Sequence, residues 1–348
     1  MSQNEVRVAA DALEAFTKEV FVRAGLTDED AAIEAELLIW ANLRGIDSHG
    51  VLRIPWYLGM VDSGLMNPRP KVQVLRETPA VLYIDADRGF GPPVTVPVMR
   101  QVIEKAKAVG IGWALLRNIT HQGAMGYYAL MAVQANMAGL AIVCSPPNMA
   151  PYGAKAAGLH NSPIAIAVPA KNYPPLVLDM ATSVIAGGKI DLAIDKNAPL
   201  QPGWTIDKDG NPTTIADRSN ILLPAGGPKG SGLALMFQGL TSLMANNPLL
   251  VPALRDGNFD HNQNSVVAAI DIGLFGDVES YKENVDELIG ELKALPKAEG
   301  VDEILMPGEP EFKVYQERAR DGIPLPPGTA QKLRDAAARF GLALPEGI

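Results

Sequence analysis

Apolar residues recur at helical spacing over the first 65 or so positions of the chain. A first helix is predicted by four apolar residues three or four positions apart, Leu13, Phe16, Val20 and Ala24, and Gly25 is placed to end it. Thr27-Asp-Glu-Asp30 has the form of a capping box and opens a second helix, which ends at Arg44-Gly45. A third helix is expected from about Pro55, a residue tolerated in a first turn, to about Gly64. The N-terminal part is therefore predicted to be helical.

After Asn67-Pro-Arg-Pro70 the pattern changes to short apolar runs bounded by turn residues, which is typical of strands. Strands are predicted at 71–76, 80–85, 111–116, 140–145, 164–169, 176–179 and 265–272. Helical spacing predicts helices at 92–109, 127–138 and 232–245. Amphipathic helices return at 278–295 and 328–340. The predicted layout is therefore a pair of helical ends around a mixed α/β middle.

Composition narrows the class of protein. Of 348 residues, 47% are hydrophobic and 20% charged, which is ordinary for a globular enzyme and argues against disorder. A net charge of -9 without a basic run argues against a nucleic-acid partner. The single cysteine, Cys144, excludes an intramolecular disulfide, fits a reducing compartment and stands in an apolar run as a buried thiol. Residues 1–6 show no signal-peptide pattern, and every apolar run is too short for a membrane span, so a soluble, cytoplasmic protein is expected.

The richest chemistry stands in Asp47-Ser48-His49-Gly50, four residues before Arg53 and just where a helical pattern stops. Histidine has an unperturbed pKa near physiological pH and is the usual proton donor or acceptor in catalysis. Ser48 or Asp47 can select its tautomer, and Arg53 can hold a planar carboxylate with two parallel hydrogen bonds. Taken alone, the same four residues are more typical of a turn than of a catalytic site.

The chain has three other histidines. His121 stands between a predicted strand and a predicted helix, a position that presents catalytic groups or merely caps the helix. His160 and His261 stand in polar loop sequence and are expected to be solvated. No HxxxH, HxH or CxxC spacing occurs, so no metal site is expected.

Two glycine-rich stretches are candidates for phosphate-binding loops. Gly89-Phe-Gly-Pro-Pro-Val94 places prolines where backbone N–H groups are needed and lacks the third small residue, so it is no Rossmann fingerprint. Gly227-Pro-Lys-Gly-Ser-Gly232 lacks the order of a Walker loop. It still places Lys229 in a glycine-rich turn ahead of a helix, where the lysine either holds a phosphate or is an ordinary surface residue.

Taken together, the motifs resemble the malate/L-lactate dehydrogenase family, whose nicotinamide-binding fold is not Rossmann. The resemblance runs nearly end to end and rests on segments that follow one another in register. They are Arg44-Gly-x-Asp-Ser-His-Gly-Val51, His121 with Gly126-Tyr-Tyr128, Ser145-Pro-Pro with Ala150-Pro151, Leu178-Asp-Met-Ala-Thr-Ser183, Asp207-Lys-Asp-Gly-Asn-Pro-Thr213, Gly230-x-Gly-Leu-Ala-Leu235 and Pro307-Gly-Glu309. Relatives act on ureidoglycolate, diketogulonate, sulfolactate and piperideine-2-carboxylate.

The resemblance implies an α/β fold with a mixed, largely antiparallel sheet in a non-Rossmann dinucleotide-binding domain, plus a helical domain from both chain ends. In this chain the division would be 1–70 with 275–348, and 71–274. It also implies a homodimer with the site between subunits, and hydride transfer between NAD or NADP, with NAD favoured here, and a 2-oxo or 2-hydroxy acid.

The resemblance also implies roles for individual residues. His49, as an imidazolium, would protonate the substrate oxygen, with Ser48 orienting it and His121 lining the same pocket or acting as the base. Arg53 would hold the substrate carboxylate, and Asn161 would face the substrate. The dinucleotide would be held by Ser145, Asp179, Met180, Ala181, Lys229, Gly308, Glu309 and Pro310.

Three departures from the family pattern put the substrate in question more than the reaction. Asn161 replaces a threonine, Gly187 an arginine, and Gln122 a phenylalanine. Two alternatives therefore stay open: a reductase of cyclic imino acids, and an inactive relative that binds a small acid. A hydrolase using Ser48 and His49 is disfavoured, because the chain has no G-x-S-x-G elbow.

Overall fold

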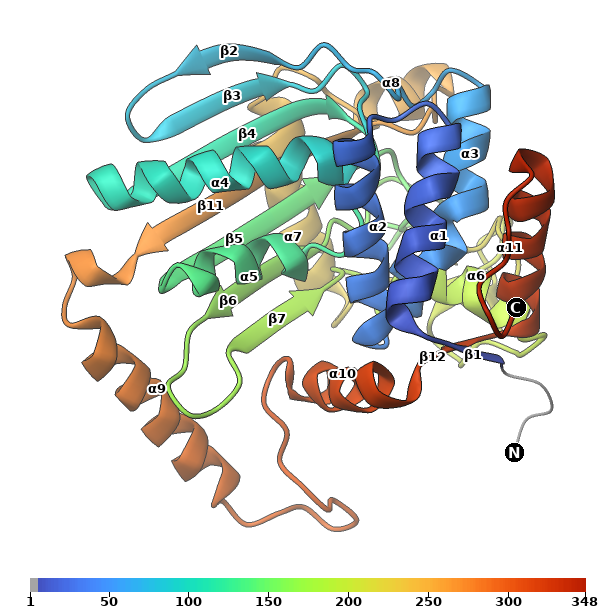
Figure 1. Cartoon of the computed structure of the whole chain (residues 1–348). Coiled ribbons are helices and arrows are strands. Elements are labelled where there is room, and N and C mark those ends of the chain that lie inside the picture. The colour runs from blue at the N-terminus through green and yellow to red at the C-terminus, as the bar shows by residue number, and fades with distance from the viewer. Residues whose placement is uncertain (1–5) are drawn as a thin grey trace.

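A helical unit is built from both ends of the chain in the computed structural model, which describes residues 6–348. The N-terminal helices are α1 (Ala10–Arg23), α2 (Asp28–Leu43) and α3 (Ile54–Asp62), and α11 (Pro327–Phe340) packs beside them. Figure 1 shows these four helices side by side at one end of the sheet. β1 (Val6–Val8) pairs with β12 (Ile323–Leu325), which ties the two chain ends together. The predicted cap of α2 is confirmed, because the Thr27 hydroxyl accepts the Asp30 N–H.

The middle of the chain forms a seven-stranded sheet in the order β2-β3-β4-β11-β5-β6-β7. Its strands are β2 (Gln73–Glu77), β3 (Val81–Asp85), β4 (Ile111–Ile119), β5 (Met137–Cys144), β6 (Ile164–Val168), β7 (Leu176–Met180) and β11 (Gln263–Asp271). β3 and β4 are parallel and are joined by the crossover helix α4 (Gly91–Val109); every other neighbouring pair in this sheet is antiparallel. The mixed, largely antiparallel and non-Rossmann sheet expected from the sequence is confirmed.

Each face of the sheet carries a different core, because successive strand residues point to opposite sides. Leu116 and Val267 belong to the core beneath α4 and α5 (Gly126–Gln134). Their neighbours Leu115 and Val266 pack on the other face against Ala245, beyond the π-helix Gly239–Leu243 that extends α7 (Pro228–Gln238). Figure 1 shows α4 and α5 in front of the strands and α7 behind them.

Several smaller elements surround this body. They are α6 (Gly188–Asp195), α8 (Leu250–Asp256), α9 (Val278–Lys293), α10 (Glu309–Asp321), the short 3-10 turns η1 (Asp47–His49), η2 (Val51–Arg53) and η4 (Ile272–Leu274), and a small sheet of β8 (Thr205–Ile206), β9 (Pro212–Thr213) and β10 (Ile221–Leu222). Of these, the helical spacing of apolar residues predicted α9 alone; the helix expected to open at Thr182 or Ser183 is α6, which begins only at Gly188. In the case of α10, a glycine and a proline so close together are typical of a tight turn, but Gly308 and Pro310 are the N-cap and first turn of a helix.

One predicted helix is shorter than expected. The helix expected at 127–138 ends at Gln134, because Asn136 adopts a left-handed conformation (φ 59°) and β5 begins one residue later. Cys144 is completely buried, as predicted. The division into two domains stays a prediction. Residues 1–5, on which the expected absence of a signal peptide partly rests, lie outside the described residues. Within 6–348, none of the helices combines the length and hydropathy required to cross a bilayer.

Candidate active site

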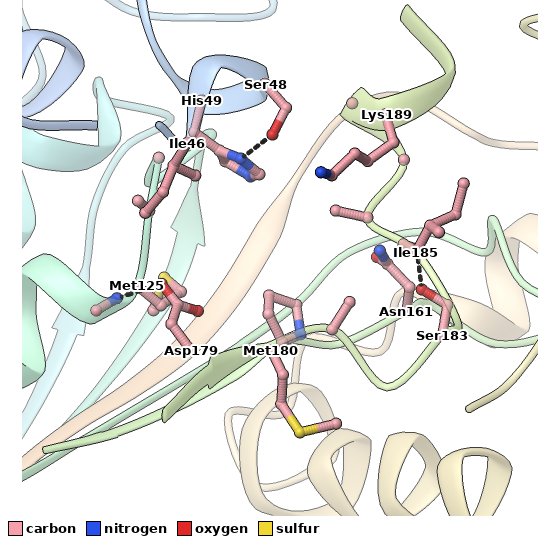
Figure 2. A pocket seen from close by; sticks show the side chains of 18 of the residues that line it. Ile46, Ser48, His49, Met125, Asn161, Asp179, Met180, Ser183, Ile185 and Lys189 are labelled. Carbon is pink, nitrogen blue, oxygen red and sulfur yellow. Dashed lines mark hydrogen bonds between the residues drawn. The ribbon is translucent and has the colours of Figure 1, made fainter. Parts of the chain in front are cut away.

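A cavity of about 1150 Å³ lies between the helical unit and the ends of the central strands. Figure 2 shows Ser48 and His49 facing Lys189 and Asn161 across it, with Asp179 and Met180 along the lower edge of the view. The sequence-predicted residues that line it are Ser48, His49, Arg53, His121, Ser145, Asn161, Asp179, Met180, Ala181, Gly308 and Pro310. Two predicted residues, Lys229 and Glu309, are not among its lining residues.

The loop that carries His49 is held from two directions. The Asn42 side chain, on α2, donates to Asp47 Oδ1 (2.8 Å) and accepts the Val51 N–H (2.9 Å). From α10, Arg318 donates to both oxygens of Asp47, at 2.6 and 3.0 Å. A Cβ atom at Gly50 would lie 2.1 Å from Asn42 Oδ1, so this close approach requires glycine. The turn therefore has one defined geometry.

His49 is a neutral imidazole in this arrangement. The Ser48 hydroxyl lies 3.0 Å from its Nδ1 atom. Burial, and to a lesser degree the charge of Arg53, lower the His49 pKa to about 3. The surrounding wall therefore disfavours a second positive charge beside Arg53 in the free protein, and the role of His49 as the proton donor stays a prediction.

His121 lies parallel to His49, with ring centroids 5.5 Å apart and an angle of 20° between the planes. Its Nδ1 atom is 2.6 Å from the Tyr57 hydroxyl and receives the Gly123 N–H at 3.3 Å. A backbone N–H can only donate, so Nδ1 is an acceptor and the neutral ring carries its proton on Nε2. Burial, with Arg53 and His49, holds the His121 pKa well below its usual value.

Arg53 is fixed on several sides. Its Nε atom donates to the Ser48 carbonyl at 2.7 Å, and Nη1 lies 3.3 Å from Asp191 Oδ2. The guanidinium also stands over the Trp56 ring, 5.3 Å from its centre. A Cβ atom at Gly188 would lie 2.4 Å from Nη2, so the first residue of α6 must be glycine to leave room for it. Asp191 was not found from the sequence, since no local pattern links it to Arg53.

His160 and His261 were expected to be solvated, and this was wrong. The His160 side chain is buried, and the His261 ring lies 4.9 Å from Trp56 and 6.1 Å from His121, so both line the cavity with His49. Burial is the main cause that lowers their pKa values to about 3 for His160 and about 4 for His261. The polar sequence around these two histidines did not indicate burial, because their loops fold inward only in the tertiary structure.

Asn161 is oriented by Asn148. The Asn148 amide nitrogen donates to Asn161 Oδ1 (3.1 Å), and Asn148 Oδ1 accepts the Asn161 N–H (2.8 Å). With its oxygen engaged, Asn161 presents its Nδ2 donor to the cavity, as Figure 2 shows.

Most of the expected dinucleotide residues lie at the ends of β5 and β7 and at the start of α10. Asp179 faces the cavity and accepts the Gly126 N–H at 2.7 Å, while burial raises its pKa to about 6. Gly308 has φ +87°, and a Cβ atom there would lie 2.9 Å from Val177, so only glycine fits. Ser145 donates to the Asn262 carbonyl at 3.0 Å. The cavity is larger than a small acid requires, and this extra space fits a dinucleotide.

The two expected residues outside the cavity have other surroundings. Glu309 pairs with Lys293 at 2.8 Å and accepts the Met306 N–H at 2.8 Å, so it holds the turn that precedes α10. Lys229 is exposed near the start of α7. Across residues 6–348, no group of three or more His, Cys, Asp or Glu side chains is arranged to hold a metal ion.

Comparisons with known proteins identify the family to which the chain belongs. The model of the malate/L-lactate dehydrogenase family matches residues 8–334. The malate dehydrogenase of Pyrococcus horikoshii is 36% identical over 98% of both chains, and the L-sulfolactate dehydrogenase of Methanocaldococcus jannaschii is 36% identical over 99% of this chain and 98% of that one. The ureidoglycolate dehydrogenase (NAD(+)) of Escherichia coli is 29% identical over 91% and 92%.

The fold of this chain also matches that of a solved structure. The structure of malate dehydrogenase from Pyrococcus horikoshii superposes with a TM-score of 0.89 at 35% identity, covering 100% of this chain and 98% of that one. The match therefore includes the helical unit, the sheet and the cavity between them. The chain belongs to the malate/L-lactate dehydrogenase family.

Proposed function

We propose that this protein is an NAD(P)-dependent dehydrogenase that interconverts a 2-hydroxy acid and a 2-oxo acid by hydride transfer. The observation that carries the proposal is the stacked pair of His49 and His121, both lining one cavity with the fixed guanidinium of Arg53. Reduction of a 2-oxo acid requires a group that protonates the carbonyl oxygen, a second hydrogen-bond donor to that oxygen, and a cation that binds the carboxylate. The family supports an oxidoreductase of hydroxy and oxo acids.

The two histidines are suited to different roles. The Ser48 hydroxyl can donate to His49 Nδ1 when the ring is neutral and accept from it when the ring is protonated, so His49 can act as the base in one direction and, once protonated, as the acid in the other. His121 has no such freedom, because the Gly123 N–H always occupies its Nδ1 side. His49 is therefore the acid/base, and His121 donates a hydrogen bond from Nε2 to the substrate oxygen.

Arg53 is the clamp for the substrate carboxylate. Its side chain is 12% exposed and already held by Ser48 and Asp191, so little conformational entropy remains to be lost when the acid binds. Asp191 also receives Arg218 at 3.1 Å, so its charge is shared between two arginines and leaves Arg53 able to attract an anion. Asn161 offers a further donor from the opposite wall.

The dinucleotide supplies or takes the hydride. Ser145, Asp179, Met180, Ala181, Gly308 and Pro310 are the cavity-lining residues that would hold it. NAD is favoured over NADP, and one relative at 29% identity carries NAD(+) in its name. Lys229 and Glu309 stay predictions: replacing Lys229 with alanine is expected to raise the dinucleotide Kd if the lysine reaches a phosphate.

The experiment that tests the function follows absorbance at the nicotinamide band with a panel of 2-oxo acids and cyclic imino acids, using NADH and NADPH in turn. Oxidation of the dinucleotide by at least one 2-oxo acid is expected. Turnover with cyclic imino acids alone would make the protein an imino-acid reductase. Dinucleotide binding without turnover on any acid would leave a small-acid-binding relative. A thermal shift compared between the two dinucleotides checks the preference for NAD.

We also infer that two copies associate through α7 and the π-helix behind the sheet. Leu235, Met236, Leu243 and Met244 are between 54% and 63% exposed there, a row of large apolar side chains that a lone chain leaves in water. A second copy of the chain is the occupant that the family resemblance implies. Light scattering is expected to give twice the chain mass, and Met236→Asp to give monomers, whereas Ile215→Asp, on an exposed loop outside α7 and the π-helix, should not. A monomeric wild type would refute this.

Action in the cytoplasm is part of the same proposal. Its support is the single buried cysteine, which cannot form an intramolecular disulfide and requires no oxidising compartment. Fractionation of the producing cell tests it directly.

A further inference from the structure

A buried carboxyl group lies behind the histidine pair and has no part in the reaction proposed above. Glu34, on α2, is completely buried, and neither of its carboxyl oxygens has a hydrogen-bond partner among residues 6–348. One turn further along the helix, Leu37 belongs to the core beneath α4 and α5, and Leu38 belongs to the core of the helical unit. Glu34 therefore lies where the two cores meet, out of reach of bulk water.

No opposite charge compensates this group. Burial raises the Glu34 pKa well above its usual range, and no lysine, arginine or histidine of the described chain acts against that rise. An isolated carboxylate in apolar surroundings would cost far more than its protonated form. Burial without a partner therefore favours the neutral acid, which has one O–H to donate and oxygen lone pairs to satisfy.

Two buried tyrosines belong to the two cores that meet at Glu34: Tyr57 packs in the core of the helical unit with Leu38, and Tyr128 in the core beneath α4 and α5 with Leu37. Burial raises the pKa of both Tyr57, on α3, and Tyr128, on α5, and Glu34 adds to the rise in each case. Arg53 acts in the opposite sense on the pKa of Tyr57, and Thr95 does so on the pKa of Tyr128, which Tyr57 and Tyr127 also raise. The Tyr57 hydroxyl is the group that contacts His121 Nδ1 at 2.6 Å. Glu34 is thus coupled to the site through Tyr57.

A second unpaired acceptor lies next to the same residues. Gln122 Oε1 is buried without a partner within the described chain, although its amide nitrogen donates to Thr95 (2.7 Å). The Tyr128 hydroxyl donates to the Gln122 carbonyl at 2.7 Å, which places the glutamine beside the tyrosines. Buried polar atoms in proteins are almost always paired, and internal water supplies the partner where side chains do not. Two such orphans around one pair of tyrosines indicate an internal water site.

We propose that protonated Glu34, through internal water shared with the two tyrosines, holds the Tyr57 hydroxyl as a hydrogen-bond donor to His121. Glu34 is then a positioning residue: together with the Gly123 N–H, the Tyr57 hydrogen bond that it maintains holds His121 Nδ1 as an acceptor and keeps the proton on Nε2, on the side that meets the substrate. An ionised Glu34 would be a stronger acceptor and would draw the Tyr57 proton away from His121. The catalytic consequence rests on the proposed function, but the hydrogen-bond arrangement does not.

Kinetics of three variants test the role. Glu34→Gln keeps a neutral hydrogen-bonding group of the same shape, Glu34→Leu removes it, and Tyr57→Phe removes the bond to His121. We expect Glu34→Gln to retain kcat and its pH profile, whereas Glu34→Leu and Tyr57→Phe each lower kcat at least about fivefold without changing the dinucleotide Kd. A folded Glu34→Leu protein with wild-type kcat and pH profile would overturn the proposal. So would a Glu34→Gln protein as impaired as Glu34→Leu.

Spectroscopy tests the arrangement without turnover. The infrared spectrum at pH 7 should contain the C=O band of a protonated carboxyl group that Glu34→Gln removes. Nitrogen NMR of histidine-labelled protein should show His121 with its proton on Nε2, and a changed signal in Tyr57→Phe. A missing band, or a proton on Nδ1, refutes the inference even if Glu34→Leu does not fold. Correct spectra from an enzyme inactive on every acid would refute the proposed function instead.

Discussion

Side-chain hydrogen bonds distinguish two histidines that look equivalent in the cavity. His49 and His121 are both neutral and stacked on each other, but His49 contacts a hydroxyl and His121 a backbone N–H. A hydroxyl reverses its direction at little cost, whereas an N–H cannot. The reversible proton transfer therefore belongs to His49, and the fixed donor to His121. His49 must also acquire its proton in the loaded site, because the free protein disfavours the imidazolium.

Replacing His49 with asparagine is expected to lower turnover by at least about 10², because it removes the acid and leaves the cavity wall intact. The dinucleotide Kd, measured by fluorescence titration, should stay unchanged. His160→Asn is the matched control, since it removes another buried cavity histidine that has no contact with Ser48. If His49→Asn kept turnover within a few-fold of wild type, the acid would have to be His121.

Arg53→Lys tests the clamp. Lysine keeps the charge but loses the planar two-point grip and the contact with Trp56. We expect kcat/KM for 2-oxo acids to fall at least about 10-fold, roughly 1.4 kcal/mol of transition-state stabilisation, with little change in dinucleotide affinity. Steady-state kinetics over a series of acid concentrations measures this. Weaker dinucleotide binding with unchanged use of the acid would make Arg53 a phosphate ligand.

At the scale of elements, the catalytic turn depends on helices far apart in the chain. α2 supplies Asn42, and α10 supplies Arg318, whose contact with Asp47 joins residues 271 positions apart. Asp47 and Arg318 side chains are 21% and 13% exposed, so this pair is partly shielded from water. A shielded bidentate contact stabilises more than the same contact on the surface.

Arg318→Met should therefore lower both stability and activity. Removing the partner of Asp47 is expected to cost about 1–3 kcal/mol in the free energy of unfolding and to lower kcat several-fold, because the turn loses its anchor. Urea unfolding and steady-state kinetics measure the two effects. Arg339→Met is the control: its bidentate pair with Asp62 is 42% and 52% exposed, and its loss should cost less than about 1 kcal/mol with full activity. Equal effects of the two variants would count against an anchoring role.

At the scale of the whole molecule, the folded protein keeps its histidines in the neutral form, and this determines how its stability depends on pH. In the unfolded chain a histidine binds its proton near pH 6.5. In the folded protein the pKa falls to about 3 for His49 and His160 and about 4 for His261, and His121 shifts the same way. Between those values the unfolded state binds more protons, so stability rises with pH and is lost as the pH falls below about 6.5.

The free energy of unfolding is therefore expected to decrease steadily from pH 6.5 to pH 4, as measured by urea unfolding at fixed ionic strength. Asp179, with its pKa raised to about 6, has the opposite sign: its protonation favours the folded state as the pH falls. With Glu34, which shifts the same way, it offsets only part of the effect of four histidines. A His160→Gln, His261→Gln double variant should show a shallower dependence. Stability that is constant over this range in the wild type would contradict buried, neutral histidines.

Local patterns in the sequence determined most of the elements and the family. Helical spacing, the Thr27 cap and the apolar runs were sufficient for α1 to α5, α7, α9, α11 and the main strands, because these depend on near neighbours. The motifs around His49, His121 and Asp179 located the cavity-lining segments before their distances were known. Where a local pattern has two meanings it failed: the turn at Gly308 was also the start of α10.

Only the tertiary structure decided which of these residues act together. His160 and His261 belong to the cavity, and Asp191 holds Arg53 across 138 positions, because separate loops fold onto one end of the sheet. The protonation states follow from the same packing, since burial is what lowers the histidine pKa values and raises that of Glu34. Sequence patterns report the preferences of neighbouring residues, whereas burial and pairing across the chain exist only once it has folded.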